Sequence, residues 1–530
     1  MTTVKRIGHW PLMTDCNDTT DYGRHGEGHA VTFEDGAVFD GVQSAVRLPG
    51  VRETDGSQPF TMSMEFNVED GHGYLPGGLC SRYSNESMRG WHLSVLTQTG
   101  VTSTQANLRN LQFGWNTSTP VDEWRDWGSP GHSRFIVALC VFNGGLYAGT
   151  FDDERDNKGH VHRLGDNGEW IDCGHPDDSN AVAALAEFNG KLYAGTMRYR
   201  AAGSLLPESP NQEPGGRIYR YEGGSEWTLI GQLPVPDSDS VGALVVYENR
   251  LIAMSFYPYG IFAYAEDGSY ESLGAPGNNL RTHTLGVHQG ELYVGCNQSG
   301  GVYKRTLHTP WTYCGTAPHV VQVYCFTTYH DELLMGIWDE GRMLRYDGDE
   351  QWSNRGLLGQ EQEVMGVSVY NGRLYAGTLP GGHVYRYAGN TNWEFLKEVE
   401  PPSELTPYRR VWSMAVYDGS LFVGTLPEGK VWSLRNDPLA TSDKSLSPGW
   451  HRAAVTYDME KLSLYVDGQL VSSSAAAFPA TGEPLLADIP LMLGTGPQCH
   501  YSGKLRDVEL FDGALAADDI AQLHGGTERL

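Results

Sequence analysis

The chain is short of basic residues and of long apolar runs. Its 530 residues include 38 Lys and Arg against 65 Asp and Glu, which gives a formal net charge of -27. This negative charge argues against nucleic acid and against an anionic membrane surface as partners. A membrane-spanning helix needs roughly 20 consecutive apolar residues, and the sequence has no such run. The N-terminus also lacks an apolar signal region, so we expect a cytoplasmic protein, or a secreted or periplasmic one whose signal was removed.

Cysteines and clustered metal ligands are also scarce. The eight cysteines are scattered and form no Cys-x-x-Cys pair, so we expect them to be reduced and buried. His160 and His162 flank Val161 with a spacing that can supply two metal ligands, but the preceding residues Phe151–Gly159 have the character of a solvated loop. The sequence therefore contains no feature that requires a cofactor, and it predicts no metal ligands. A structural calcium ion remains an open alternative.

A short repeat dominates the middle of the chain. The pentapeptide Leu-Tyr-Ala-Gly-Thr occurs intact at 146–150, 192–196 and 374–378. Degraded copies begin at Leu251, Leu292, Leu333 and Leu421, and several neighbouring copies lie 41 residues apart. A fixed period of this length is typical of repeat architectures, with longer spacings explained by loop insertions.

Each repeat has the pattern of four short strands. In the copy around residue 374, Val364–Tyr370 and Arg373–Thr378 alternate like strands and flank Asn371-Gly372, a pair that favours a tight hairpin turn. Two further strands are predicted at His383–Tyr387 and Trp393–Lys397. Four antiparallel strands in about 41 residues are typical of a β-propeller blade.

The seven copies predict a closed ring. The last copy has three strand patterns and lacks the fourth, but residues 122–128 (DEWRDWG) match the fourth-strand region 168–174 (GEWIDCG) of the first copy. We expect this early segment to complete the last blade, because closure removes the free sheet edges. The prediction is a seven-bladed β-propeller at 119–440.

The flanking segments resemble one domain cut in two. Phe39-Asp40-Gly41, Gly449-Trp450-His451 and Leu464-Tyr465-Val466-Asp467-Gly468 are similar to motifs of laminin-G/concanavalin-like jelly-roll sandwiches. The resemblance implies an all-β fold in which residues 1–118 and 441–530 form one β-sandwich and the propeller is an insertion. It also implies sugar binding, sometimes with calcium, although no ligand residue can be matched one by one.

The candidate site comes from positions where the repeat is broken at one rim of the ring. The blade-to-blade connection and the loop after the second strand share that rim in an up-and-down blade. At these positions the early copies have mostly small or apolar residues, whereas polar and aromatic residues occur mostly in the later copies. The candidates are Arg198, Tyr257, Arg281, His283, Asn297, Gln322, Tyr324, Trp338, Arg410 and Trp412.

This set of side chains favours an acidic oligo- or polysaccharide as the ligand. Arg presents a planar fork to carboxylates, and the aromatic rings can stack on sugars. One chemistry that uses these groups together is β-elimination at a uronic acid. We expect His283 to be the base, Tyr324 or Tyr257 the proton donor, and Arg281 and Arg410 the carboxylate ligands.

The remaining candidates, Asn297, Gln322, Trp338, Trp412 and Arg198, are expected to bind substrate. In architecture and site composition the chain resembles propeller-type polysaccharide lyases and rhamnoside-cleaving enzymes. Two alternatives stay open. One is a glycoside hydrolase, which needs two carboxylates and could draw on Asp152, Asp153, Asp339, Glu340 and Glu363. The other is a non-catalytic scaffold that binds carbohydrate or protein.

Overall fold

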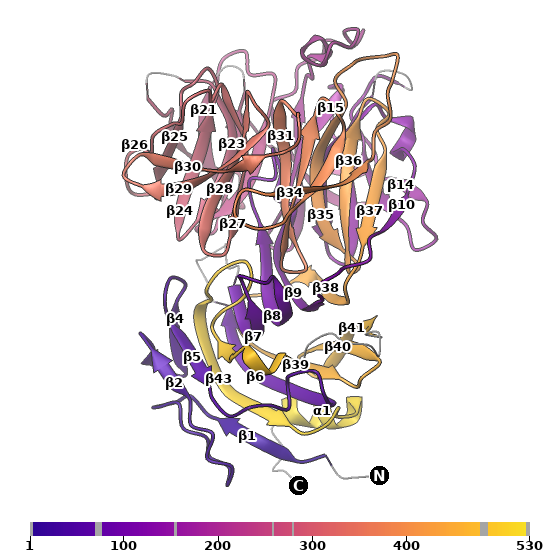
Figure 1. Ribbon diagram of the computed structural model, residues 1–530. Helices are drawn as coiled ribbons and strands as arrows, with labels where there is room; N and C mark the ends of the chain where they lie inside the picture. The colour runs from indigo at the N-terminus through magenta and orange to yellow at the C-terminus, as the bar shows by residue number, and fades with distance from the viewer. Residues whose placement is uncertain are drawn as a thin grey trace.

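The computed structural model describes residues 4–68, 77–152, 156–256, 259–277, 280–476 and 486–525. Two β-rich bodies are stacked end to end, with a sandwich below a ring of sheets (Figure 1). Within the described ranges the only α-helix is α1 (Ala517–His524), and no helix there is long and apolar enough to cross a membrane. The predicted all-β class, a propeller inserted into a concanavalin-like sandwich, is confirmed.

The sandwich is built from both ends of the chain. Its first sheet has the order β3 (Thr32–Phe33), β4 (Ala37–Asp40), β43 (Ser502–Phe511), β6 (Phe60–Val68), β39 (Gly449–Tyr457), β40 (Lys461–Val466) and β41 (Gln469–Ala475), with β1 (Arg6–Trp10) beside β43. Its second sheet has the order β2 (Glu27–His29), β5 (Ala45–Leu48), β42 (Leu491–Leu493), β7 (Gly77–Ser84), β8 (Arg89–Gln98), β9 (Asn107–Asn116) and β38 (Leu439–Ser445). Each sheet contains strands from both flanks, with C-terminal strands inserted between N-terminal ones, so neither flank can complete a core alone.

Two segments of the sandwich are hard to recognise from the sequence. Residues His29–Asp40 alternate in polarity, but they divide into the end of β2, β3 and β4, which lie in two different sheets. The residues of β7 are buried almost throughout, so its sequence lacks the polar alternation that marks a half-exposed strand.

The propeller strands pair in units of four. The first three units are β11 (Phe135–Phe142), β12 (Gly145–Phe151), β13 (Val161–Leu164), β14 (Trp170–Asp172); β15 (Ala181–Phe188), β16 (Lys191–Met197), β17 (Arg217–Gly223), β18 (Glu226–Gln232); and β19 (Ala243–Tyr247), β20 (Arg250–Ser255), β21 (Gly260–Tyr264), β22 (Tyr270–Gly274). The next two are β23 (Thr282–His288), β24 (Glu291–Cys296), β25 (Val302–Arg305), β26 (Thr312–Tyr313); and β27 (Gln322–Tyr329), β28 (Glu332–Trp338), β29 (Arg342–Gly348), β30 (Gln351–Leu357). The last two are β31 (Glu363–Tyr370), β32 (Arg373–Leu379), β33 (His383–Tyr387), β34 (Trp393–Glu398); and β35 (Arg410–Tyr417), β36 (Ser420–Leu426), β37 (Val431–Arg435), β10 (Glu123–Asp126).

The ring closes through the early strand, as the sequence predicted. Strand β10 pairs with β37 in antiparallel register, from Glu123 opposite Arg435 to Asp126 opposite Trp432. At the other end of the propeller segment the prediction was slightly too long. Leu439 and Ala440 already belong to β38 and pair with Gly114 and Phe113 of the sandwich.

A hairpin of the sandwich enters the centre of the ring. Strands β8 and β9 rise from the sandwich into the base of the propeller (Figure 1), and the residues between them, 99–106, are buried. This segment, which we call the plug, contacts the innermost strand of every unit. For example, Phe326 N donates to Gly100 O at 2.9 Å, and Leu244 N donates to Ser103 O at 3.2 Å.

The plug and the ends of β8 and β9 satisfy polar groups on all seven innermost strands. The other bonded groups lie on Val141, Leu185, Val246, Thr284, Val287, Met365, Val369, Trp412 and Val416. A buried backbone group without a partner costs free energy. The innermost strands are the sheet edges that face the central tunnel of the ring, and they carry many such groups. The plug removes that cost and closes one end of the tunnel. Gly100 is needed at its tip, because a Cβ there would lie 2.7 Å from Leu285 O.

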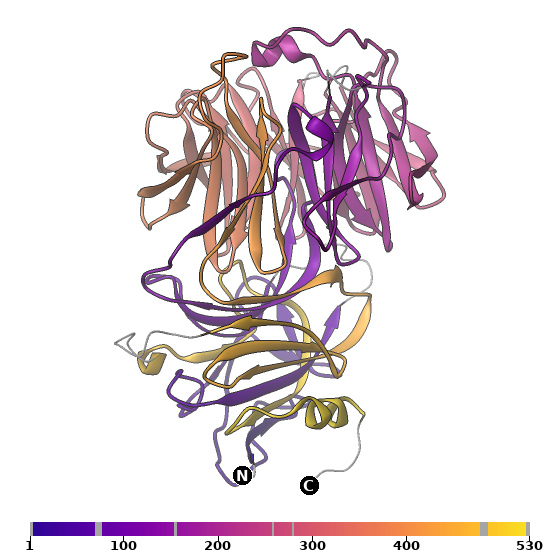
Figure 2. The same ribbon diagram turned by 90° about the vertical axis from the view of Figure 1, so that its right-hand side faces the viewer.

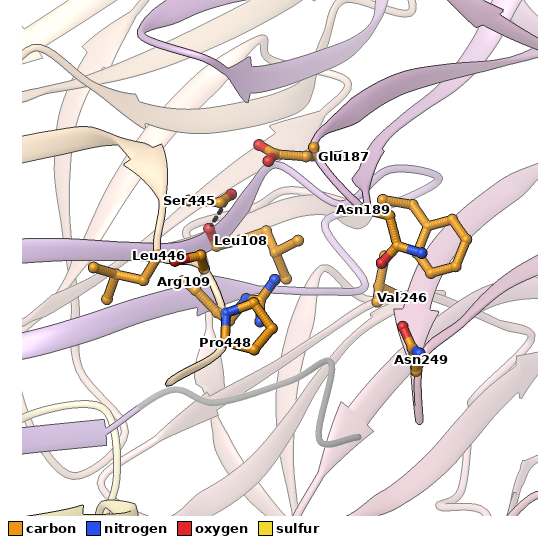
Figure 3. A pocket seen from close by; sticks show the side chains of 12 residues that line it. Leu108, Arg109, Glu187, Asn189, Val246, Asn249, Ser445, Leu446 and Pro448 are labelled. Carbon is orange, nitrogen blue, oxygen red and sulfur yellow. Dashed lines mark hydrogen bonds between the residues drawn. The ribbon is translucent and has the colours of Figure 1, made fainter. Parts of the chain in front are cut away.

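The two domains also meet along a seam beside the plug. A cavity of about 360 Å³ lies there, between β9, the turns of the second and third units and the chain after β38. Figure 3 shows Glu187 facing Ser445, whose hydroxyl donates to Leu108 O at 2.7 Å. Burial raises the pKa of Glu187 to about 7, against the opposing effects of Ser445 and Arg109.

The cysteine prediction is also confirmed. All eight cysteines are free and buried. Burial raises the pKa of the Cys173 thiol above its usual value and that of Cys314 to about 11, so these side chains behave as small apolar groups.

Candidate functional site

The propeller carries a cup-shaped cavity of about 400 Å³ around its axis. Its floor includes Ser103 of the plug, so the cup is closed toward the sandwich. Its walls come from the starts of the innermost strands and the ends of the second strands. Nine of the ten candidate residues line it: Arg198, Arg281, His283, Asn297, Gln322, Tyr324, Trp338, Arg410 and Trp412. The tenth, Tyr257, lies outside the described residues.

β-Bulges aim several of these side chains into the cup. The register between first and second strands shifts by one residue at His283, at Tyr324 and at Trp412. The same shift occurs at Val137, Ala183 and Met365. A bulge bends its strand and redirects the extra residue. At least six units therefore have one position whose side chain points inward. Only some of these units carry a functional group at that position.

His283 sits in an aromatic enclosure at the centre of the cup. Its ring stacks on Phe256 with centroids 4.9 Å apart and meets Tyr324 edge-on at 4.8 Å. Trp412 completes the enclosure at 6.1 Å. Among the described residues neither ring nitrogen of His283 has a hydrogen-bond partner. Burial, reinforced by Arg281 and Arg410, lowers its pKa to about 3, so the free cup holds a neutral imidazole.

Arg410 is fixed by a long loop of the second unit. The connection between β16 and β17 contains the short 3₁₀ helix η2 (Ala201–Ser204) and reaches across the end of the ring far from the sandwich (Figure 2). Arg410 donates to Ser204 Oγ at 2.7 Å and to the Tyr199 hydroxyl at 3.3 Å. Thr406 anchors the same helix by donating to Ser204 O at 2.7 Å. The loop therefore orients the Arg410 guanidinium from above.

Tyr324 and Glu363 interact with each other beside Arg410. Burial, with Glu363 nearby, holds the pKa of the Tyr324 phenol well above its usual value. Burial also raises the pKa of Glu363, and Arg410 and the Tyr324 hydroxyl only partly oppose this shift. The Tyr324 phenol therefore keeps its proton near neutral pH, and Glu363 holds a proton more tightly than an exposed carboxyl does. Glu363 was named among the carboxylates available to a hydrolase, but not as a site residue.

The other candidates form contacts with one another and with neighbouring residues in the wall of the cup. Asn297 N donates to Arg281 O at 2.8 Å, and Asn297 forms a β-bridge with Gln322 of the next unit. Gln322 also pairs with Trp338, which in turn pairs with Glu363. Arg198 donates to Gln212 in the long loop. These contacts tie the fourth, fifth and sixth units together at the rim.

The lining also includes residues that no break in the repeat pattern singled out. Phe256 follows β20, Tyr408 precedes β35, and Phe135 begins β11. Ser103 belongs to the other domain. An aromatic ring at the end of a strand is a weak sequence signal, and nothing in the repeat could indicate a floor supplied by the sandwich.

A comparison with protein families addresses the sandwich. The model described as the concanavalin A-like lectin/glucanases superfamily matches residues 409–521. The sandwich strands within this range, β38–β43, are concanavalin-like. The matched range starts just before β35, so it takes in the last three propeller strands as well as β38–β43. No curated protein matches the chain.

Solved structures similar to the chain are distant in sequence. A streptogramin B lyase is 12% identical, with 60% of this chain and 98% of its own covered and a TM-score of 0.48. The virginiamycin B lyase of Staphylococcus aureus is 12% identical over 59% and 99%, with a TM-score of 0.46. A protein of unknown function from Bacteroides thetaiotaomicron is 12% identical over 78% and 98%, with a TM-score of 0.37. Similarity at this level transfers no activity to this chain.

Proposed function

We propose that the cup is the active site of a lyase that cleaves a uronic-acid-containing oligo- or polysaccharide by β-elimination. The observation that carries this proposal is the combination of a neutral imidazole, a neutral phenol and two guanidiniums in one enclosed space. Propeller and concanavalin-like folds are both found in carbohydrate-active proteins. A cup of about 400 Å³ lies within the range of small-ligand sites and suits one or two sugar rings.

The reaction assigns one role to each group. His283 takes the proton from the carbon next to the uronic carboxylate. The electron pair forms a carbon–carbon double bond as the adjacent carbon–oxygen glycosidic bond breaks, and Tyr324 gives a proton to the leaving oxygen. Arg281 and Arg410 bind the carboxylate and stabilise the charge that develops on it.

The electrostatics of the cup link the basicity of His283 to binding. Burial and the two guanidiniums lower the pKa of His283 to about 3 in the free protein. A substrate carboxylate placed against Arg281 and Arg410 would offset part of their charge, and a nearby negative charge raises the pKa of an imidazole. The base would then gain strength when the substrate is in place.

A two-carboxylate hydrolase fits the cup less well. Such enzymes place two carboxyl groups on opposite sides of the scissile bond. Among the described lining residues Glu363 is the only Asp or Glu. Asp339 raises the pKa of Glu363 through its charge but does not itself line the cup.

The test is a screen of uronic-acid glycans, read by the ultraviolet absorbance of the unsaturated uronide and by new reducing ends. His283→Gln should lower the rate by about 10²–10⁴-fold, as expected for loss of a general base. His288→Gln is the matched control. His288 is buried on the same strand and bonds Thr328 at 2.9 Å, outside the cup.

The outcomes separate the alternatives. Absorbance that depends on His283 and not on His288 supports the lyase. Reducing ends without absorbance would indicate a hydrolase and overturn the proposal. Saturable glycan binding without either product, unchanged by His283→Gln, would indicate a binding protein.

A further inference from the structure

A second cluster of chemically active side chains lies in the first propeller unit. His160 directly precedes β13, His162 lies within β13, and Asp172 pairs with His162 from the end of β14. One ligand atom from each of the three lies within 4.8 Å of the others. The cup, in contrast, is lined by innermost strands and by the ends of second strands, so this cluster is a separate feature.

The sequence places the two histidines on one face of the blade. Residues two apart on a strand point to the same side. The backbone of His160 is held by Thr150, the last residue of the first Leu-Tyr-Ala-Gly-Thr motif, whose N–H donates to His160 O at 3.0 Å. Both imidazoles are buried, whereas the Asp172 side chain is about one-third exposed and leaves a path from solvent.

We propose that His160, His162 and Asp172 bind a divalent transition-metal ion of the zinc type. The Nδ1 atom of His160 lies 3.0 Å from Asp172 Oδ1. Two ligands of a tetrahedral zinc ion, each at about 2.0–2.1 Å, lie about 3.3 Å apart, so this pair needs little movement. Two imidazoles with one carboxylate favour zinc, cobalt or nickel over calcium, which prefers oxygen ligands alone.

Asp156 supplies the outer support that such a site requires. It lies 3.0 Å from His160 Nε2. A metal-bound histidine normally donates its other N–H to a carboxylate, which fixes the tautomer and the ring orientation. With Nδ1 of His160 toward the ion, Nε2 would donate to Asp156.

The seventh unit provides an internal comparison. There Asp126 pairs with Trp432, as Asp172 pairs with His162. Asp126 also accepts a bond from Gly128 N at 2.8 Å, as Asp172 does from Gly174 N. In the seventh unit, however, Lys430 and Trp432 occupy the positions of the two histidines, and the carboxylate contacts Lys430 Nζ at 3.1 Å. The same backbone thus carries an ordinary ion pair in one unit and a set of metal ligands in the other.

The experiment is titration of chelator-treated protein with ZnCl₂ by calorimetry, followed by Co²⁺ absorption as a signature of tetrahedral geometry. We expect one equivalent of Zn²⁺ to bind and the melting temperature to rise. Asp172→Asn should weaken binding at least tenfold, His162→Gln more, and Asp156→Asn by about 10–100-fold through the outer contact. The matched control Asp126→Asn should bind like the wild type.

Two results would overturn the site. One is the absence of stoichiometric binding in the wild type. The other is equal affinity in Asp172→Asn and Asp126→Asn, which would leave His160 as a structural contact of Asp156 and Asp172 without a metal ion. Because Asp172 is partly exposed, its variant decides the question even if His162→Gln fails to fold. The catalytic proposal for the cup does not depend on either outcome.

Discussion

Replacing Glu187 with Gln should make the stability of the protein less sensitive to pH. The Glu187 carboxyl is buried at the seam between the domains (Figure 3), and burial raises its pKa from 4.5 to about 7. A carboxyl whose folded-state pKa exceeds its unfolded-state pKa stabilises the fold below the unfolded value. That contribution is lost as pH rises through the folded value. The loss therefore falls between pH 4.5 and about pH 7.

The magnitude follows from the change in the pKa. The pKa of Glu187 rises from 4.5 to about 7, and each pKa unit corresponds to about 1.4 kcal/mol, so the wild type should lose up to about 3 kcal/mol across this window. The substituted glutamine does not titrate and has nearly the same size and shape as the glutamic acid. Relative to the wild type, Glu187→Gln should therefore become steadily more stable as the pH rises from 4.5 to about 7.

The assay is thermal and urea unfolding of both proteins at several pH values, and the quantity that matters is the difference between them. Glu226→Gln, an exposed change on β18 of the same unit, serves as the control. Parallel stability curves for Glu187→Gln and the wild type would show that Glu187 ionises freely in the folded state and would refute the reasoning.

Three further predictions concern the plug, the seam and the cysteines. Thr102 donates to Met365 O at 2.9 Å and to Trp412 O at 3.2 Å. Thr102→Val should cost about 2 kcal/mol in urea unfolding, because it leaves these buried carbonyls without that donor, and Thr102→Ser should restore most of the loss. Arg373 and Asp437 form a buried ion pair at 2.7 Å, so Arg373→Met should cost about 3–5 kcal/mol by leaving the carboxylate unpaired; a change below about 1 kcal/mol would show that water reaches it. A thiol reagent should label the native protein slowly and all eight cysteines after denaturation, and fast labelling of the native protein would contradict their burial.

The plug also bears on the proposed function. It brings Ser103 to the floor of the cup and ties the backbone of Trp412 to the sandwich. A propeller expressed without the sandwich would therefore lack both a floor and the donors to its innermost strands. The domains are best understood as one unit in which the sandwich completes the site.

Much of the site could be predicted because the repeat aligns equivalent positions. Residues such as His283, Tyr324 and Trp412 stand out only when the seven copies are compared, and equivalent positions of a ring must lie at the same rim. The sequence could not show how they point inward. Their orientation depends on bulges, which are set by pairing between strands and leave no clear mark in a single strand.

The sequence alone determined most of the strands, the repeat and the closure by residues 122–128, and the resemblance of the two flanks to one sandwich family indicated that they join. The strands, the repeat and the closure follow from local periodicity and from the need to bury apolar faces and pair sheet edges. The tertiary structure decided the plug, the bonds from Arg410 to the loop around η2 and the meeting of His160 with Asp172. Each of these depends on hydrogen bonds between segments distant along the chain, and such partners are chosen by the packing of the whole fold rather than by neighbouring residues.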